Sequence, residues 1–359
     1  MTLESRIVEK INAGRFSPEI LECIVFDYLK MFREKIMQKF YYEKAGNTEK
    51  QFAEYILIET TRALLQMRPV TFFLYLKNRE ELRDILSLKY LEHYEGWRDF
   101  DRKRKYFKRD FSKVLKKSLN KKIDEIFILD TTIEETDLSK IRKDKMKDGI
   151  HDAEQHSSTK GSEVGFIVCT LINWSTLSTV KTEIFPNNTS KKEIWEKMVI
   201  DTLKTKTGKI KLVIADKSFF AYQNYLSSLH YEIIPLIKPG KNLKDEVIKK
   251  IEDIPASQLW WDQRYAGMLD TLLEDFGEII EMTTSRIPNY DKSKEIRAQI
   301  EIVFKTSKIY GMKELHVYYK NAAHWKVYIQ LYLASLFLQY LKLQKININR
   351  AIKYFQQKS

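Results

Sequence analysis

The sequence predicts an α/β protein with an all-helical N-terminal region. Three observations lead to this fold class. Apolar residues recur at helical spacing through about the first 115 residues, apolar runs with strand character follow from residue 126, and helical and strand patterns alternate after residue 190. With 43% hydrophobic and 31% charged residues, the chain has the composition of a folded protein, and 359 residues suffice for two or three domains.

The N-terminal region is predicted to contain several helices. Apolar side chains follow the helical period over residues 20–31 and again over residues 52–63. Pro69 and residues 78–79 predict breaks between helices, and residues 83–91 continue the helical pattern.

Residues 101–122 form the most basic stretch of the chain. Phe107 and Phe111 fall on one helical face and leave the cations on the other, which suits a helix that docks on a core and binds phosphates. A merely solvated basic face is the alternative. The candidate DNA-binding cations of this stretch are Lys103, Arg104, Lys105, Lys108 and Arg109.

The central region predicts a sheet that begins antiparallel and continues parallel. Three strands come first, and a helix with Thr189 or Ser190 as its N-cap leads into strand, helix and strand. This order is that of a ribonuclease-H-like fold, although it also suits other α/β folds. The predicted strands are residues 126–130, 164–172, 177–185, 211–216 and 231–237, with helices at 190–203 and 219–229.

The C-terminal third predicts an insertion followed by helices. The pattern loosens over residues 238–291, and a long helix starts near Lys294. The apolar run at residues 325–341 contains polar residues and falls short of the roughly 20 apolar residues of a membrane span, so we expect a buried helix. The predicted parts are a helical region (1–122), a catalytic core (123–237 and 292–320), an insertion (238–291) and C-terminal helices (321–359).

The net charge of +13 favours a polyanionic partner, either nucleic acid or an anionic membrane surface, although basic tails alone would also produce it. The N-terminus lacks the pattern of a signal peptide, and two distant cysteines predict neither a disulfide nor a zinc site. We therefore expect a cytoplasmic protein.

Three acidic residues carry the predicted chemistry. Asp130 and Asp216 each follow an apolar run and are predicted to end their strands, where side chains of an α/β sheet reach ligands. Glu301 lies on the long helix beside its apolar face, and Arg297 and Lys308 lie within roughly 40° of it on the helical wheel. An ordinary Arg–Glu pair on an amphipathic helix is the alternative interpretation of the last motif.

Three carboxylates suit metal-dependent phosphodiester chemistry. Two divalent ions about 4 Å apart activate the attacking oxygen and stabilise the leaving oxygen, and Mg²⁺ needs only a few protein carboxylates. The predicted cofactor is therefore Mg²⁺ or Mn²⁺, as two ions. Arg297 and Lys308 would neutralise phosphate charge near the reaction.

Residues 127–341 resemble the DDE transposases of prokaryotic insertion sequences. ILDTT is similar to the family's first-aspartate strand, and LVIAD followed by a helix and a strand is similar to its second-aspartate block. Arg297-x3-Glu301-x6-Lys308 resembles the Tyr-x2-Arg-x3-Glu-x6-Lys signature of one large group, with Lys294 in the place of the tyrosine.

The resemblance implies a DNA transposase with Asp130, Asp216 and Glu301 as catalytic, metal-binding residues, and with Arg297, Lys308 and the Lys294 position at DNA. It implies double-stranded DNA partners, namely terminal inverted repeats and target DNA, a homodimer on DNA, and action on the nucleoid rather than on a membrane. A nuclease without strand transfer and a non-catalytic DNA-binding descendant are the alternatives.

Four further residues are of interest. Trp260 and Trp261 in the predicted insertion resemble aromatic residues that stack on a flipped base, but aromatic packing is the favoured interpretation. His151 and His156 are interpreted as solvated residues of a polar loop, because they lack metal-ligand spacing.

Overall fold

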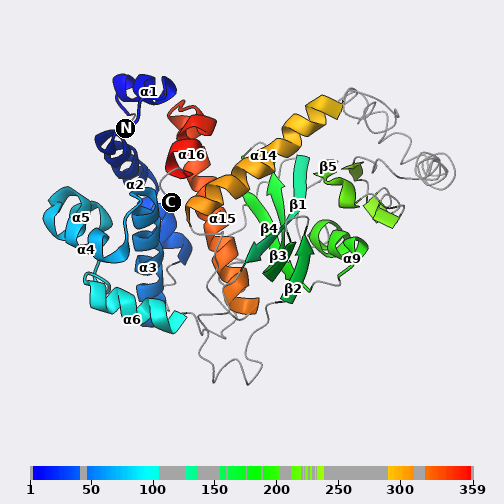
Figure 1. Cartoon of the computed structure of the whole chain (residues 1–359), viewed down its shortest axis with the longest axis horizontal. Coiled ribbons are helices and arrows are strands. Elements are labelled where there is room, and N and C mark those ends of the chain that lie inside the picture. The colour runs from blue at the N-terminus through cyan, green and yellow to red at the C-terminus, as the bar shows by residue number, and fades with distance from the viewer. Residues whose placement is uncertain are drawn as a thin grey trace. The chain divides into compact units, whose positions relative to one another are not determined.

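The structure is a computed structural model (Figure 1). It describes residues 3–40, 47–104, 126–135, 154–158, 161–174, 176–186, 189–202, 212–219, 221, 223–224, 227–228, 231, 233–237, 290–310 and 320–356. The chain divides into two compact units. We call Met1–Ser118, Glu134–Phe166 and Ile302–Ser359 the helical unit, and Leu119–Ile133 with Ile167–Glu301 the sheet unit.

The predicted all-helical N-terminal region is confirmed for its described residues. Helix α4 starts at Pro69 and ends at Asn78, so both predicted breaks are confirmed. The prediction that the helix continues to residue 91 is wrong, because α5 ends at Leu86 and Ser87 adopts a left-handed conformation with φ 47°. The helices of this unit include α1 Ser5–Asn12, α2 Pro18–Phe40, α3 Asn47–Leu64, α4 Pro69–Asn78, α5 Glu80–Leu86, α6 Tyr94–Arg104, α15 Lys320–Leu343 and α16 Ile348–Gln356.

Helix α15 lies in the core of the helical unit. Its Phe337 and Tyr340 contact the fully buried Tyr28 of α2, with ring centroids 5.5 Å apart in both pairs. Asp27 accepts hydrogen bonds from the Tyr340 hydroxyl at 3.1 Å and from Gln344 Nε2 at 3.0 Å, which satisfies polar groups beside the apolar contact. The prediction of a buried helix is therefore confirmed, and no helix among the described residues is sufficiently long and apolar to span a bilayer.

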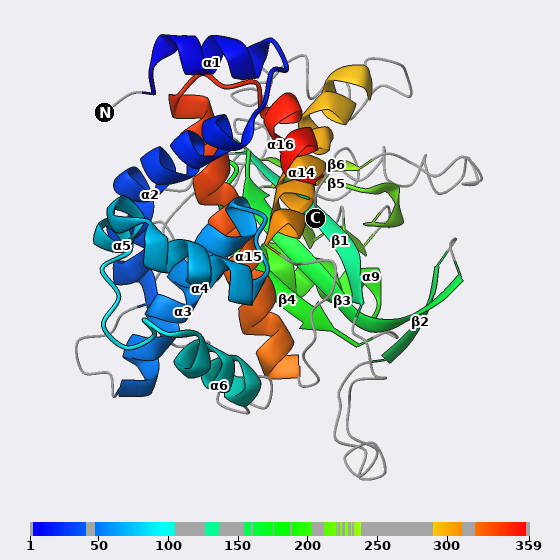
Figure 2. The same ribbon diagram turned by 60° about the vertical axis from the view of Figure 1, so that its left-hand side comes forward.

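The described strands form one mixed sheet in the order β2-β3-β1-β5-β6, and β4 also pairs with β3 (Figure 2). The strands β2, β3 and β4 pair antiparallel, whereas β1, β5 and β6 pair parallel. This arrangement confirms the predicted antiparallel beginning and parallel continuation. The strands are β1 Ile126–Glu135, β2 Glu154–Ser158, β3 Gly161–Asn173, β4 Thr179–Phe185, β5 Leu212–Ala215 and β6 Ile234–Ile237.

Two details of the sheet differ from the sequence prediction. Strand β1 does not end at Asp130 but continues to Glu135, because the threonines and Ile133 that follow are β-branched residues with strand preference. Strand β2 contains His156 and pairs with β3, so the interpretation of this histidine as a loop residue is wrong. His151 lies outside the described residues.

One face of the sheet is covered by helix α9 Lys191–Trp195 and the π-helical turn η2 Glu196–Ile200. Ser190 is the N-cap, and its Oγ accepts a hydrogen bond from the Glu193 amide at 3.1 Å, as predicted. Trp195 is fully buried against Phe219, and its indole N–H donates to Ser228 Oγ at 2.9 Å. These contacts fix α9 on the sheet.

Candidate active site

The sheet brings Asp130 and Asp216 together. Strand β1 pairs in parallel with β5 up to Leu129, which lies opposite Ala215. Asp130, still in β1, and Asp216, the residue directly after β5, come next in the sequence, and neighbouring strands lie about 4.8 Å apart. The two side chains therefore leave the sheet at the same level, and both residues are half-buried.

Alternation along the strands determines which face the two aspartates share. Phe127, Leu129 and Ala215 belong to the core under α9. Asp130 and Asp216 each follow such a core residue, so they extend from the opposite face of the sheet. In both views β1 lies between α9 and helix α14, which spans Tyr290–Ile309 (Figures 1 and 2).

Short-range backbone hydrogen bonds orient both carboxylates. The Thr131 amide donates to Asp130 Oδ1 at 2.7 Å, and the Ser218 amide donates to Asp216 Oδ2 at 3.5 Å. The Phe219 amide donates to the Asp216 carbonyl at 2.9 Å, which closes the short 3-10 helix η3 Lys217–Phe219 directly after β5. An aspartate that accepts from the following amides is typical of a tight turn, as Asp216 does before η3.

Lys191 is a half-buried cation near this end of β1. Its Nζ donates to Thr131 Oγ1 at 3.2 Å and lies 4.8 Å from the centre of the Phe219 ring. Burial lowers the pKa of Lys191, while the neighbouring Cys169 and the carboxylates of Asp130 and Asp216 act in the opposite direction. The ammonium therefore lies within electrostatic reach of both aspartates.

Sequence reasoning missed Lys191, although a signal was present. Lys191 directly follows the N-cap Ser190, where the partial positive charge of the helix disfavours a cation by about 0.3–1 kcal/mol. A lysine at the first position of a capped helix therefore indicates a negative partner nearby. The contacts of Lys191 with Thr131 and Phe219 can be recognised only in the folded structure, where α9 packs on the sheet.

Glu301 is exposed on α14 and belongs to the same compact unit as both aspartates. The buried Ile300 and Val303 fix the helix at this point, and Lys308 is exposed about two turns further on. Among the described residues, no group of three acidic, histidine or cysteine side chains is placed to hold a metal ion. The side chains of Lys294 and Arg297 lie outside the described set.

The donor set at the two strand ends fits a hard divalent cation. Asp130 and Asp216 offer carboxylate oxygens from fixed backbone positions, and Mg²⁺ is commonly bound by one or two carboxylates plus water and substrate oxygens. Cys169 near this site is fully buried, and burial raises the pKa of its thiol, so it is not suited to bind a metal as thiolate.

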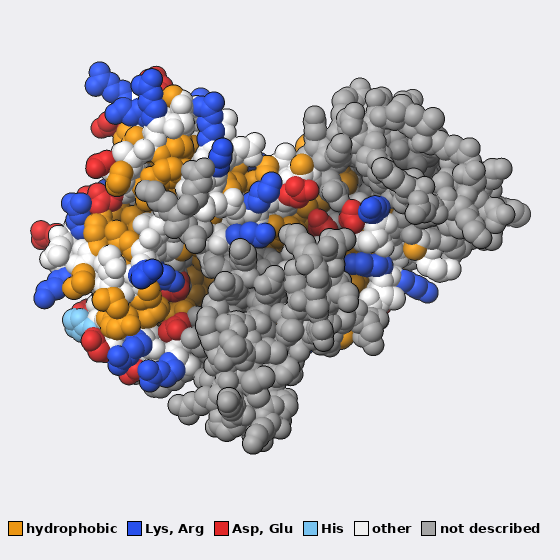
Figure 3. Space-filling view, viewed as in Figure 1, with side chains coloured by type: hydrophobic (Ala, Val, Ile, Leu, Met, Phe, Trp, Pro, Cys, Tyr) orange, Lys and Arg blue, Asp and Glu red, His pale blue; other side chains and the backbone are white. Residues whose placement is uncertain are grey.

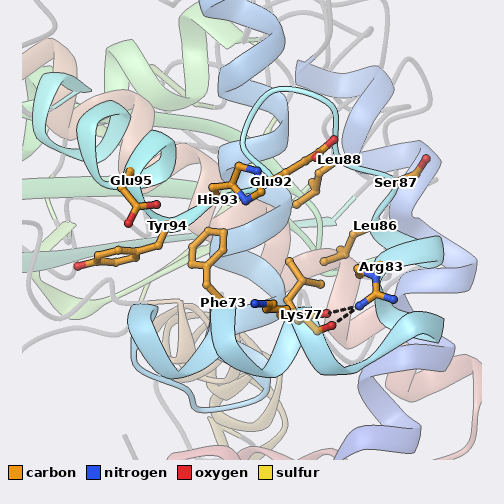
Figure 4. A pocket seen from close by; sticks show the side chains of 11 residues that line it. Phe73, Lys77, Arg83, Leu86, Ser87, Leu88, Glu92, His93, Tyr94 and Glu95 are labelled. Atoms are coloured by element: carbon orange, nitrogen blue, oxygen red, sulfur yellow. Dashed lines mark hydrogen bonds between the residues drawn. The ribbon is translucent and has the colours of Figure 1, made fainter.

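The helical unit contains a separate cavity of about 490 Å³ between α4, α5 and the start of α6 (Figure 4). Phe73, Leu86 and Tyr94 line it, and Arg83 donates to the carbonyls of Leu76 and Lys77 at the end of α4. Its arginine is therefore used in capping a helix, and the cavity contains none of the predicted acids.

The predicted basic DNA-binding surface is described only in part. On the face drawn in Figure 3, lysine and arginine side chains of the helical unit alternate with acidic and apolar ones, so its described surface shows no continuous basic patch there. Lys103 and Arg104 end helix α6, without a description of their side chains. The remaining predicted residues, Lys105, Lys108, Arg109, Trp260 and Trp261, lie outside the described residues, as does the predicted insertion.

Fold and site together define an α/β protein with an acidic site where two parallel strands stop pairing. Residues 121–338, more than half of the chain, match the model of the transposase DDE domain, and the chain belongs to this family. The resemblance to DDE transposases is thereby confirmed.

Two further comparisons complete this result. Among solved structures, the chain is similar to the cryo-electron-microscopy structure of the piggyBac transposase synaptic complex with hairpin DNA, with 9% identity and a TM-score of 0.43 over 96% of this chain and 79% of that chain. No curated protein matches the sequence.

Proposed function

We propose that this protein is the transposase of a prokaryotic insertion sequence, which cuts the ends of its element and joins them to target DNA. Water would attack the phosphodiester at the element end, and the released 3′-hydroxyl would then attack the target strand. Asp130, Asp216 and Glu301 are the proposed catalytic carboxylates, and the protein would act on nucleoid DNA in the cytoplasm.

The observation that carries this proposal is the position of Asp130 and Asp216 directly after Leu129 and Ala215, the last paired residues of β1 and β5. Two carboxylates at neighbouring strand ends offer oxygen ligands from one place, which suits the binding of a divalent cation and a phosphate. The strand order β4-β3-β1-β5-β6 also agrees with a ribonuclease-H-like core.

The residues of the chain have distinct parts in this mechanism. Asp130 and Asp216 would hold Mg²⁺ or Mn²⁺ from the sheet, and Glu301 would supply a third carboxylate from α14 when DNA is bound. When bound, two such ions would increase the nucleophilicity of the attacking oxygen and stabilise the leaving oxygen. Thr131 and η3 keep the aspartate carboxylates oriented, so little ordering is needed during the reaction.

We assign the DNA contacts to cations near the three proposed catalytic acids and to the basic stretch at residues 101–122. Arg297, Lys308 and Lys294 on α14 would bind phosphates at the element end, and the cations of residues 103–109 would bind the flanking duplex. Because one site must process two element ends, we expect a homodimer on DNA.

Cleavage of terminal-repeat DNA in Mg²⁺ or Mn²⁺ tests the proposal. Asp216→Asn preserves the size of the side chain but removes the charge, so cleavage should fall by about a hundredfold or more. DNA binding in metal-free buffer should be retained. Glu301→Gln should behave in the same way, whereas Glu196→Gln on η2 is the control. Full cleavage by Asp216→Asn would overturn the assignment.

Strand transfer separates a transposase from a nuclease on the same fold. Purified protein, two pre-cut element ends with free 3′-hydroxyls and a supercoiled target plasmid should yield joined products. Cleavage of the ends without any joined product would favour a nuclease.

A further inference from the structure

The C-terminal half of α14 is held by two glutamine side chains from other helices. Gln330 Nε2 of α15 donates to the carbonyl of Tyr310, the residue directly after α14, at 2.9 Å. Gln356 Nε2 of α16 donates to the Lys305 carbonyl, about one turn before the helix ends, at 2.8 Å. We call these two hydrogen bonds the glutamine anchor. All of these residues belong to the helical unit, and both views show the end of α14 beside α16 (Figures 1 and 2).

Gln330 is a polar residue in an apolar part of α15. It is 3% exposed, and its neighbours Ile329 and Leu331 are buried. Its Oε1 is buried as well and has no hydrogen-bond partner among the described residues. Such an acceptor reduces stability, so an apolar side chain would suit the packing at this position better. What a glutamine provides and an apolar residue cannot provide is the hydrogen bond to the end of α14.

The anchored half of α14 determines the side to which Glu301 points. Val303, Thr306 and Ser307 are fully buried. Because an α-helix turns by roughly 100° per residue, these three side chains lie on the side of α14 opposite to Glu301, which is exposed. The boundary between the two units falls directly after Glu301, within this continuous helix. A rotation of the anchored half would therefore turn Glu301 as well.

We propose that Gln330 and Gln356 are positioning residues for Glu301. Their side-chain amides fix the rotation of α14 and so keep the Glu301 carboxylate on the exposed side of the helix, where it can bind a divalent cation. Both glutamines act through the backbone of α14 and are not themselves catalytic. The inference rests on the proposed function only for the role of Glu301 as a metal ligand.

Gln344, directly after α15, provides a matched control. It is 6% exposed, its Nε2 donates to Asp27 Oδ2 at 3.0 Å, and its Oε1 accepts a hydrogen bond from the Leu3 amide at 3.1 Å. Gln344 is thus buried and hydrogen-bonded like Gln330, but these bonds hold α2 and the N-terminal segment. Replacement of either glutamine by methionine removes the same amide group and keeps a side chain of similar size.

Hydrogen exchange on the metal-free protein without DNA tests the anchor itself. In Gln330→Met, the amides of residues 302–309 should exchange about tenfold faster, because the end of α14 opens more easily. In Gln344→Met these amides should exchange at the unaltered rate, although that variant also loses buried hydrogen bonds. Unchanged exchange in Gln330→Met, or an equal increase in both variants, would overturn the inference.

Titration of Mn²⁺ into the complex with a pre-cut element-end duplex tests the link to Glu301. Glu301→Gln should weaken Mn²⁺ binding by about tenfold and Gln330→Met by about threefold, because the carboxylate is lost or less well placed. The double variant should bind Mn²⁺ as Glu301→Gln does, since Gln330 acts only through that carboxylate. Gln344→Met should bind Mn²⁺ like the unaltered protein. A loss of affinity in Gln330→Met that persists in the Glu301→Gln background would contradict a positioning role, and so would no loss at all.

Gln356→Met repeats both measurements at a less buried site, in case the Gln330 variant does not fold. It removes the other half of the anchor, so it should change the exchange rate and the Mn²⁺ affinity in the same direction. The absence of both changes would overturn the inference.

The inference and the proposed function fail separately. Unchanged Mn²⁺ affinity in Glu301→Gln would reject Glu301 as the third metal ligand. Hydrogen exchange would still decide whether the two glutamines hold α14.

Discussion

Each unit contains acidic side chains shielded from bulk water, but the two units hold them in different ways. In the helical unit, Glu54 is only 4% exposed. Its carboxylate accepts the backbone amides of Lys89, Tyr90 and Leu91 at 2.8, 2.8 and 2.9 Å. In the sheet unit, Asp130 and Asp216 directly follow Leu129 and Ala215, the last paired residues of the parallel strands β1 and β5.

The difference separates a structural acid from a pair suited to chemistry. Three amides around one carboxylate satisfy its charge and tie the connection between α5 and α6 to α3. Two neighbouring aspartates instead concentrate negative charge, which costs stability unless a cation is present. We therefore expect removal of the Glu54 carboxylate to reduce stability, and removal of the Asp130 or Asp216 carboxylate to reduce DNA cleavage.

The largest effect is expected for Asp130→Asn. Cleavage of terminal-repeat DNA should fall by about a thousandfold, which corresponds to a loss of about 4 kcal/mol in transition-state stabilisation. The free energy of unfolding in metal-free buffer should not decrease, because carboxylate repulsion is removed. Cleavage kinetics and urea unfolding measure the two quantities. If Asp130→Asn lost stability but kept its cleavage rate, Asp130 would be a structural acid like Glu54, and the assignment would be wrong.

Glu54→Ala should have the opposite profile. Three buried amides lose a charged acceptor, so the free energy of unfolding should decrease by about 3 kcal/mol. Urea unfolding measures this loss, and Glu92→Ala in the same connection is an exposed control. An unchanged unfolding midpoint would show that the three hydrogen bonds contribute little. At a temperature where the variant is folded, cleavage per folded molecule should equal that of the unaltered protein.

A third prediction concerns the half-buried Lys39 of the helical unit. Lys39 in α2 lies over the Tyr332 and Tyr328 rings, with Nζ 4.3 and 5.5 Å from their centres, and donates to the Tyr328 hydroxyl at 3.2 Å. Burial, followed by the nearby Lys35, lowers the pKa of Lys39 to about 7. The folded state therefore disfavours the charged lysine, with the full penalty below pH 7.

The penalty is relieved as the pH rises from 7 toward the normal lysine pKa, because the unfolded chain then binds more protons than the folded one. Relative to Lys39→Met, the unaltered protein should gain about 1–2 kcal/mol of stability between pH 7 and 9, after discounting for partial exposure. Urea unfolding at both pH values measures this difference. Lys10→Met, at an exposed site of α1, should show no such dependence.

The smallest effect is expected at the cap of α9. Ser190→Ala removes the acceptor of the Glu193 amide and should reduce the free energy of unfolding by about 1 kcal/mol. Thr189→Ala should have little effect. Thermal unfolding of the two variants measures the difference. Equal losses for both would mean that the cap does not determine the position of Lys191.

Local patterns in the sequence predicted most of the sheet and the first two acids. The apolar runs before Asp130 and Asp216 indicated buried strands, and Ser190 with its neighbours indicated a helix start. The parallel pairing of β1 and β5 needs a long crossover connection, and the chain between them, which includes α9 and η2, supplies one. The adjacent placement of the two aspartates was therefore accessible from the sequence.

Features that depend on distant partners were not accessible. Lys191 and Glu54 are recognisable only through contacts with residues far along the chain. The end of α5 at Ser87 depends on a left-handed residue that is neither glycine nor asparagine, so the composition gave no warning. Strand β2 is short and polar, and its pairing with β3 overrides its weak strand preference. The third carboxylate, Glu301, remains a prediction from its motif.

Successive side chains of β1 point to opposite faces of the sheet, so the packing of the core and the geometry of the acidic site depend on the same strand. Phe127 and Leu129 fill the core under α9, and Asp130 follows directly on the opposite face. If β1 slipped by one residue against β5, its apolar side chains would leave the core while its aspartate turned away from Asp216. Any sequence change that permits such a slip should thus impair folding and the acidic pair together, so a folded protein of this kind carries its two aspartates already aligned.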